Sequence, residues 1–309
     1  MANRLILHIG TEKTGSTAIQ RFLQAHREWL DRQGHATPAT LGKGEHRRFP
    51  LLFYQQDQHD DLTLLEGLDD RSAGERADEV QRWQHSFELE LTRKPGQTWL
   101  ISSEHIHSRL LHDDRCMASL LEFCQRCFET TQIIVYLRDP LSAALSLWST
   151  AVLNGADLAE LPMPDNSYWN RLCCHRTTLE RLERWFPGRF QPRLFTPECW
   201  RDGDIIRDFC AAAGLALPDD YHPAPERANA TLSWLSLSLI ARLNRQGKPS
   251  RQVVQAIRHA FDHLPPPTAR AWQRRAYADA YDGSNEWVRC RHFASRSSLF
   301  DAPPEQDAP

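Results

Sequence analysis

A short apolar segment near the start of the chain runs directly into a glycine-containing loop and then into a helical pattern. The residues RLILHI (4–9) precede a loop from Gly10 to Gly15, after which apolar side chains recur at helical spacing as far as Gly34. A buried strand, a tight turn and a helix in immediate succession form the unit from which parallel sheets are built. This segment therefore predicts an α/β fold.

Three later segments are also rich in β-forming residues and are separated by helical patterns. They are TWLISS (98–103), QIIVYL (132–137) and FQPRLF (190–195). Because apolar strands with little alternation are covered on both faces, we expect three layers, with a central, mostly parallel sheet flanked by helices. Helical patterns late in the sequence add a helical C-terminal region.

Length and composition favour one large domain. With 309 residues and 41% hydrophobic residues, the chain can bury a full core. We expect a single α/β domain over residues 1–300, in which the polar residues 35–92 form an irregular insertion or lid. Residues 226–300 are expected to form a helical cap, and residues 301–309 a disordered tail.

The first loop has the spacing of a phosphate-binding P-loop, but its lysine stands in an unusual place. Gly10 to Thr17 follow G-x-x-x-x-G-x-[ST]; where nucleotide triphosphatases keep a lysine, this chain has Ser16, and Lys13 stands three residues earlier. Backbone N–H groups at the helix start and the hydroxyls of Ser16 and Thr17 predict an anion site in a P-loop-type fold. The ammonium of a lysine at the outer bend would contact the group that is attached to a single bound phosphate.

A second anion motif follows the third predicted strand. Arg138 ends this strand, Asp139 and Pro140 form a helix start, and Ser146 stands eight residues after the arginine. A guanidinium forms forked, charge-assisted hydrogen bonds to a phosphate, and a serine hydroxyl adds one more. The segment therefore predicts a second phosphate contact.

Together the two motifs resemble those of the sulfotransferases that use 3′-phosphoadenosine 5′-phosphosulfate (PAPS). KTGST resembles the family's 5′-phosphosulfate loop, K-[ST]-G-[ST]-[ST], and the arginine and serine resemble its 3′-phosphate motif; RANATLS and SNEWV look like bacterial members. The resemblance implies a metal-independent transfer in which Lys13 stabilises the bridging oxygen. It also implies donor contacts by Lys13, Thr14, Gly15, Ser16, Thr17, Arg138 and Ser146.

The transfer needs a base for the acceptor proton, and WLISSEHIHSRL offers candidates at a strand end. Glu104 follows the strand at the edge where parallel sheets keep their sites. Members of the family use either a glutamate or a histidine in this role. We prefer Glu104, while His105 and His107 remain alternatives.

Other polar clusters have plainer interpretations. His46 stands with Arg47 and Arg48 in the predicted insertion, where it belongs either to a solvated basic loop or to a contact with an anionic or sugar-rich acceptor. The CxxC pair Cys124 and Cys127 lies on a helical apolar pattern, which is typical of core cysteines. No second pair accompanies it, so we expect no zinc site.

Bulk properties limit the partners and the location. A formal net charge of −3 gives no overall reason to expect nucleic acid or an anionic membrane as a partner. The first apolar segment is too short and wrongly flanked for a signal peptide, and no run approaches the about 20 apolar residues of a membrane span. We therefore expect a cytoplasmic protein.

Three functions remain open from the sequence. The first is a PAPS-dependent sulfotransferase acting on a hydroxyl or amine, with a saccharide or glycolipid as the first candidate acceptor by family resemblance. The second is a phosphotransferase that uses ATP with magnesium, and the third is a non-catalytic nucleotide-binding protein. Oligomeric state is not predicted.

Overall fold

The computed structural model describes residues 2–42, 44–164, 167–223 and 232–300. The chain divides into two compact units. The first comprises Met1–Leu137 with Thr178–Pro223, and the second comprises Arg138–Thr177 with Ala224–Pro309. The single domain over residues 1–300 stays a prediction.

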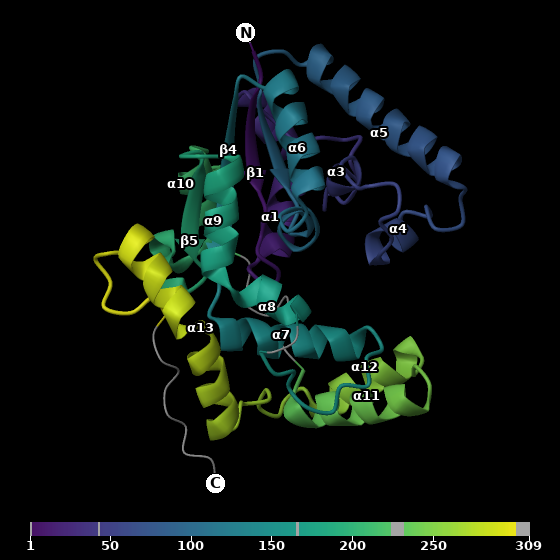
Figure 1. Cartoon of the computed structure of the whole chain (residues 1–309), viewed down its shortest axis with the longest axis vertical. Coiled ribbons are helices and arrows are strands. Elements are labelled where there is room, and N and C mark those ends of the chain that lie inside the picture. Colours follow the sequence, from purple (N-terminus) through teal and green to yellow (C-terminus); the bar gives the residue numbers. More distant parts are fainter. Residues whose placement is uncertain (1, 43, 165–166, 224–231, 301–309) are drawn as a thin grey trace. The chain divides into compact units, whose positions relative to one another are not determined.

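A five-stranded parallel sheet forms the centre of the first unit (Figure 1). Its strands are β1 (Arg4–His8), β2 (His35–Ala36), β3 (Thr98–Ser102), β4 (Thr130–Leu137) and β5 (Phe190–Leu194). Their spatial order is β2-β3-β1-β4-β5, and every pairing is parallel. The four predicted strands are confirmed, whereas β2 is too short to produce a pattern in the sequence.

Helices cover both faces of this sheet. The helical segments of this unit are α1 (Ser16–Ala25), α2 (Arg27–Arg32), α3 (Arg48–Leu51), α4 (Asp61–Leu65), α5 (Ala73–Arg93), the π-helix η1 (Ile106–Leu110), α6 (Asp114–Cys127), α9 (His175–Trp185), the 3₁₀ turns η2 (Pro197–Cys199) and η3 (Arg201–Gly203), and α10 (Ile205–Ala213). On one face, α1 and α10 pack against Ile6, Leu100 and Ile134. On the other, Phe87 of α5 lies edge-on to Trp99 of β3. The predicted three-layer α/β fold with its parallel sheet is confirmed.

The prediction of an irregular segment over residues 35–92 is wrong, because this segment contains β2, α3, α4 and the long helix α5. Only Trp83, Phe87 and Leu91 of α5 are buried, at spacings of four residues. Such a narrow apolar stripe gives a weak periodic signal in an otherwise polar helix. A capping box does mark the helix start, since Ser72 and Glu75 each bind the other's backbone N–H.

The second unit is helical in its described residues. It contains α7 (Pro140–Leu153), α8 (Ser167–Cys173), α11 (Trp234–Gln246), α12 (Arg251–Phe261) and α13 (Ala271–His292). Ser233 and Ser250 cap α11 and α12 by accepting backbone N–H groups. The helical C-terminal region is therefore confirmed, while residues 226–231 of the expected cap and the predicted tail 301–309 lie outside the described residues.

The second unit has its own apolar core. Trp148 of α7, Trp169 of α8, Ile240 of α11 and Tyr281 of α13 belong to one buried cluster. Among the helices that the structure describes, none is both long enough and apolar enough to cross a membrane.

Candidate anion-binding site

The loop between β1 and α1 lies at the carboxyl edge of the sheet. The connection that leaves β1 leads toward β2, whereas the one that leaves β4 leads toward β5, so the connections diverge between β1 and β4, the position at which open parallel sheets bind their ligands. The loop is fixed to β4 by backbone hydrogen bonds: Thr11 donates to the carbonyl of Tyr136 at 2.9 Å, and Tyr136 donates to that of Gly10 at 2.6 Å. The Thr14 hydroxyl donates to the Thr11 carbonyl at 2.5 Å. The loop thus has a defined shape before any ligand binds.

Two glycines allow that shape. Gly10 has φ 90°, and a Cβ there would lie 2.9 Å from the Cβ of Glu104. Gly15 has φ 77°, and its Cβ would lie 3.1 Å from Cε2 of Phe195. Both positions need a left-handed backbone and a missing side chain, which only glycine supplies.

We expect Gly10→Ala to lower the free energy of unfolding by about 2–4 kcal/mol, because it adds a steric contact to a left-handed backbone. Gly34→Ala is the matched control: Gly34 has φ 79°, and no atom of the described residues lies within 4 Å of its Cβ position. The control should lose only about 1 kcal/mol. Urea unfolding of both variants measures the difference, and equal losses would show that the approach to Glu104 does not constrain the loop.

The start of α1 is suited to an anion. The first turn contains no acidic residue, and the first N–H groups of a helix have no partner within it. Ser16 is 5% exposed, and its buried Oγ has no hydrogen-bond partner in the described part of the chain. A buried hydroxyl usually has a partner, so a phosphate oxygen at this point would satisfy both the hydroxyl and the helix terminus.

Lys13 and Thr17 flank this point. Lys13 lies at the outer bend with φ 63°, a conformation that non-glycine residues adopt uncommonly and that recurs at ligand-binding loops. Thr17 is half-buried in the first turn of α1. The structure therefore brings Lys13, Thr14, Gly15, Ser16 and Thr17 together in one turn.

Glu104 lies beside the same loop. It follows β3, packs against Gly10 and accepts a hydrogen bond at 2.9 Å from Nε2 of Gln20, a residue of α1. The same Nε2 donates to the carbonyl of Ser102 at 3.3 Å. Because Gln20 is itself buried, it fixes the orientation of the carboxylate from the helix that starts at the loop.

Sequence reasoning missed Gln20. It stands four residues after Ser16, on the face of α1 that buries Ile19, Phe22 and Leu23. A polar residue on the apolar face of a helix is the signal that could have found it, because a buried amide needs partners.

Two buried histidines, His8 and His46, contact Ser102, and the sequence did not predict this arrangement. Nδ1 of His8 lies 2.8 Å from the Ser102 hydroxyl, and burial lowers the pKa of His8 to about 3. His46 is 1% exposed, its Nδ1 accepts the Ser102 backbone N–H at 3.1 Å, and burial lowers its pKa to about 4. Both imidazoles are therefore neutral near pH 7.

The interpretation of His46 as part of a solvated basic loop is wrong. The segment folds back onto β3 because Phe49 and its neighbours in α3 are buried. The adjacent arginines are ion-paired: Arg48 binds Glu66 at 2.8 Å, and Arg47 binds Glu45 at 3.1 Å.

The alternative bases differ in their surroundings. His107 is fully buried, and its Nε2 lies 3.0 Å from the hydroxyl of Thr178. His105 is half-buried next to Glu104, and its buried Nδ1 has no hydrogen-bond partner among the described residues. Of the three candidates, Glu104 is the one whose backbone directly adjoins Gly10.

Arg138 and Ser146 belong to the second unit and have the local structure that the sequence predicts. Asp139 caps α7 by accepting the Ser142 backbone N–H at 2.7 Å, and Pro140 stands in the first turn. The Arg138 carbonyl accepts a hydrogen bond from Nε2 of His175 at 2.7 Å. Arg138 and Ser146 are both half-buried.

The cysteines raise the question of whether the chain holds a metal ion or a disulfide. Within the described residues, the eight cysteines are thiols that form no disulfide, and Cys124 is buried in α6. No group of three or more histidine, cysteine or acidic side chains within the described residues has an arrangement suited to a metal ion.

Comparisons with known proteins give two similar solved structures. A sulfotransferase from Alicyclobacillus acidocaldarius is 17% identical with a TM-score of 0.43; the match covers 87% of this chain and 98% of that one. A sulfotransferase domain from the curacin biosynthetic pathway is 12% identical with a TM-score of 0.38, and the match covers 91% and 98%. No protein-family model and no curated protein matches the chain.

Proposed function

We propose that this protein is a sulfotransferase that moves the sulfuryl group of PAPS to a hydroxyl group of an acceptor. The observation that carries the proposal is the buried hydroxyl of Ser16 at the start of α1, which has no hydrogen-bond partner among the residues that the structure describes. It stands where a triphosphatase has its lysine, so the loop offers a hydroxyl to one phosphate, with Lys13 at the outer bend.

Each loop residue then has a role in binding or transfer. The 5′-phosphate would accept hydrogen bonds from the Ser16 and Thr17 hydroxyls and from backbone N–H groups between Thr14 and Thr17. The Lys13 ammonium would donate to the oxygen that bridges phosphorus and sulfur. As the bond from sulfur to this oxygen breaks, the oxygen gains negative charge, which the ammonium stabilises.

Glu104 would take the proton of the acceptor hydroxyl. As the acceptor oxygen forms its bond to sulfur, the proton passes to the carboxylate, and 3′-phosphoadenosine 5′-phosphate (PAP) leaves with the electron pair of the broken bond. Gln20 holds one carboxylate oxygen, so the other oxygen remains available for the proton.

The acceptor proposed is a saccharide or glycolipid hydroxyl, an assignment that rests on the family resemblance of the motifs. A phosphotransferase that uses ATP and a non-catalytic nucleotide-binding protein are the competing functions. Ser16 argues against the first, since its position lacks the ammonium that reaches the β- and γ-phosphates.

Calorimetric titration tests the donor assignment. We expect PAP to bind tightly without magnesium, and ADP and ATP with magnesium to bind weakly or not at all. A preference for ATP with magnesium would replace the sulfotransferase by a phosphotransferase. PAP binding without transfer of ³⁵S from labelled PAPS to any saccharide in a panel would favour the non-catalytic protein.

The role of Arg138 in holding the 3′-phosphate is a prediction of the second motif. We expect Arg138→Ala to weaken PAP binding by about 10- to 100-fold, because charge-assisted hydrogen bonds are lost. Binding of adenosine 5′-phosphate, which has no 3′-phosphate, should stay within about twofold. Arg171→Ala, at an exposed arginine of the same unit, is the control. An equal loss for both nucleotides would contradict the assignment.

A further inference from the structure

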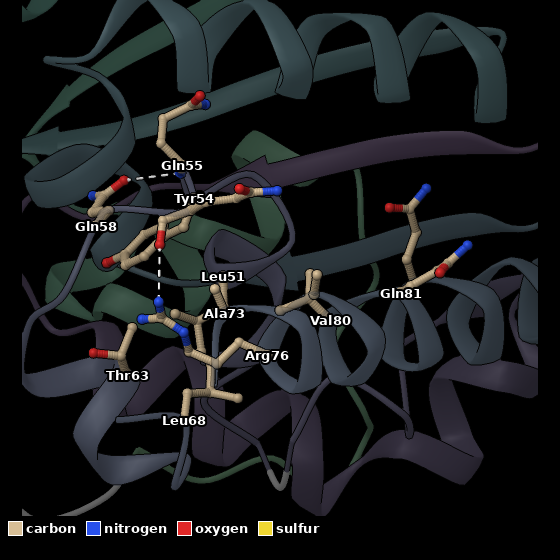
Figure 2. Close-up of a pocket in the computed structure, with 13 residues that line it drawn as sticks. Leu51, Tyr54, Gln55, Gln58, Thr63, Leu68, Ala73, Arg76, Val80 and Gln81 are labelled. Carbon is tan, nitrogen blue, oxygen red and sulfur yellow. Dashed lines mark hydrogen bonds between the residues drawn. The ribbon is translucent and has the colours of Figure 1, made fainter. Parts of the chain in front are cut away.

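A cavity of about 230 Å³ lies in the first unit between α5 and the segment that connects α3 with α4 (Figure 2). It is lined by Leu51, Tyr54, Gln55, Gln56, Gln58, Thr63, Leu68, Ala73, Arg76, Ala77, Val80, Gln81 and Gln84. None of these residues belongs to the anion-binding loop.

The lining combines an apolar base with carboxamides from two sides. Leu51 and Leu68 are buried, and Val80 of α5 lies near them in Figure 2. Five of the lining residues are glutamines, which come from the α3–α4 connection and from α5. A carboxamide both donates and accepts hydrogen bonds, as a hydroxyl does. Within the protein, Gln84 donates to Glu88 at 2.9 Å, Gln55 donates to the Cys116 sulfur at 4.0 Å, and Gln58 accepts the Gln55 backbone N–H at 3.4 Å. The Gln84 oxygen, the Gln58 amide nitrogen and the carboxamides of Gln56 and Gln81 then match a ligand with several hydroxyl groups.

The cavity offers little to an anion. Its arginine, Arg76, donates to the carbonyl of Gln56 at 3.1 Å and to the ring of His59. His59 in turn lies 3.0 Å from the carboxylate of Asp69. The guanidinium is therefore engaged by the protein and accompanied by an acidic side chain. A neutral ligand with an apolar face and hydroxyl edges fits this lining better than a phosphate or a carboxylate.

One wall of the cavity is linked to the loop that carries Lys13. The hydroxyl of Tyr54 donates to Asp60 at 2.7 Å, and Asp60 forms an ion pair with Arg109 at 3.0 Å. The same guanidinium lies 3.9 Å from the carboxylate of Glu12, the residue before Lys13. The side chains of Arg109 and Glu12 are each 15% exposed, and that of Asp60 is 21% exposed. A ligand in the cavity would therefore contact Tyr54, whose position relative to the loop is set by these contacts.

We propose that this cavity binds a neutral saccharide unit of the acceptor, with the apolar face of the sugar ring on the leucines and its hydroxyls on the glutamine side chains. The role of the cavity in sulfuryl transfer rests on the function proposed above. Saccharide binding in the cavity would itself not require PAP. A saccharide bound in the cavity would lie on the side of the loop Gly10–Gly15 where Glu12 faces Arg109.

Saturation-transfer difference NMR tests the binding on the full chain. The probes are maltose, cellobiose, lactose, trehalose and octyl glucoside below its micelle concentration. Two variants alter the cavity: Ala77→Leu fills it from the exposed face of α5 with a good helix former, and Gln81→Ala removes one exposed carboxamide. Gln246→Ala, at an exposed glutamine of α11, is the matched control.

We expect the ring protons of at least one probe to receive saturation in the wild type and in Gln246→Ala. Ala77→Leu should weaken this binding by about tenfold and Gln81→Ala by about fivefold, as expected for loss of the space and of one hydrogen bond. Absence of ring signals from every probe, saturation of the octyl protons alone, or equal signals from all four proteins would overturn the proposal.

The same samples titrated with PAP separate the two proposals. Ala77→Leu and Gln81→Ala should bind PAP as the wild type does, because neither residue lies in the loop. If PAP does not bind the wild type while a saccharide does, the donor assignment is wrong and the cavity assignment stands. If PAP binds the wild type and no saccharide does, only the cavity assignment is wrong.

Discussion

Glu104→Gln should lower kcat for sulfuryl transfer by about 10²- to 10⁴-fold, the usual contribution of a positioned general base. PAP binding should stay within about twofold of the wild type. The amide has the shape of the carboxylate, and its carbonyl oxygen can still accept the hydrogen bond that Gln20 now donates to Glu104 at 2.9 Å. The variant therefore removes the proton acceptor and leaves the packing against Gly10 intact.

The measurement is the rate at which ³⁵S passes from labelled PAPS to the saccharide that the wild type uses fastest in a panel, beside calorimetric titration with PAP. His105→Gln is the matched control, since it alters the neighbouring side chain at the same strand end. A large loss of kcat in His105→Gln, with Glu104→Gln near the wild type, would assign the base to the histidine.

Lys13→Ala should lower kcat by about 10²- to 10³-fold, the range found when one donor to a developing negative charge is removed. The bridging oxygen carries more charge in the transition state than in bound PAPS, so the ammonium is expected to affect transfer more than binding. Alanine keeps a Cβ on the backbone at φ 63°, so the variant tests the ammonium without relaxing the loop.

Lys94→Ala serves as the control for this variant. Lys94 forms an ion pair with Asp31 at 2.7 Å, at the far end of α5. The same ³⁵S assay and PAP titration apply to both variants. Unchanged kcat in Lys13→Ala, combined with much weaker PAP binding, would place the ammonium on a phosphate oxygen of the ground state and contradict its role at the bridging oxygen.

Local features of the sequence predicted much of the fold. The strand RLILHI, the glycines at positions 10 and 15 and the helix after them follow from apolar runs and turn chemistry. The caps Asp139, Ser233 and Ser250 were also predictable, because a cap depends on residues within one turn of a helix. Such signals are contained in a few consecutive residues.

Features that depend on distant contacts were missed or misinterpreted. β2 consists of two residues, which pair with Thr98 and Trp99 and have no pattern of their own. Helix α5 is polar except for a narrow stripe, of which Phe87 packs against Trp99 and Phe123. The stability of such elements comes from tertiary packing and not from intrinsic propensity.

The candidate site divides in the same way. The sequence by itself determined the types and order of the candidate anion-binding residues from Lys13 to Thr17, because the proposed phosphate loop consists of consecutive residues. Only the tertiary structure decided which other side chains surround Ser102 and Glu104, since these come from β1, α1 and the segment before α3. Parallel strands bring their carboxyl ends to one edge from positions about ninety residues apart, as for His8 and Ser102. Burial at that edge then makes each polar group seek a partner, and the fold determines which partners lie within reach.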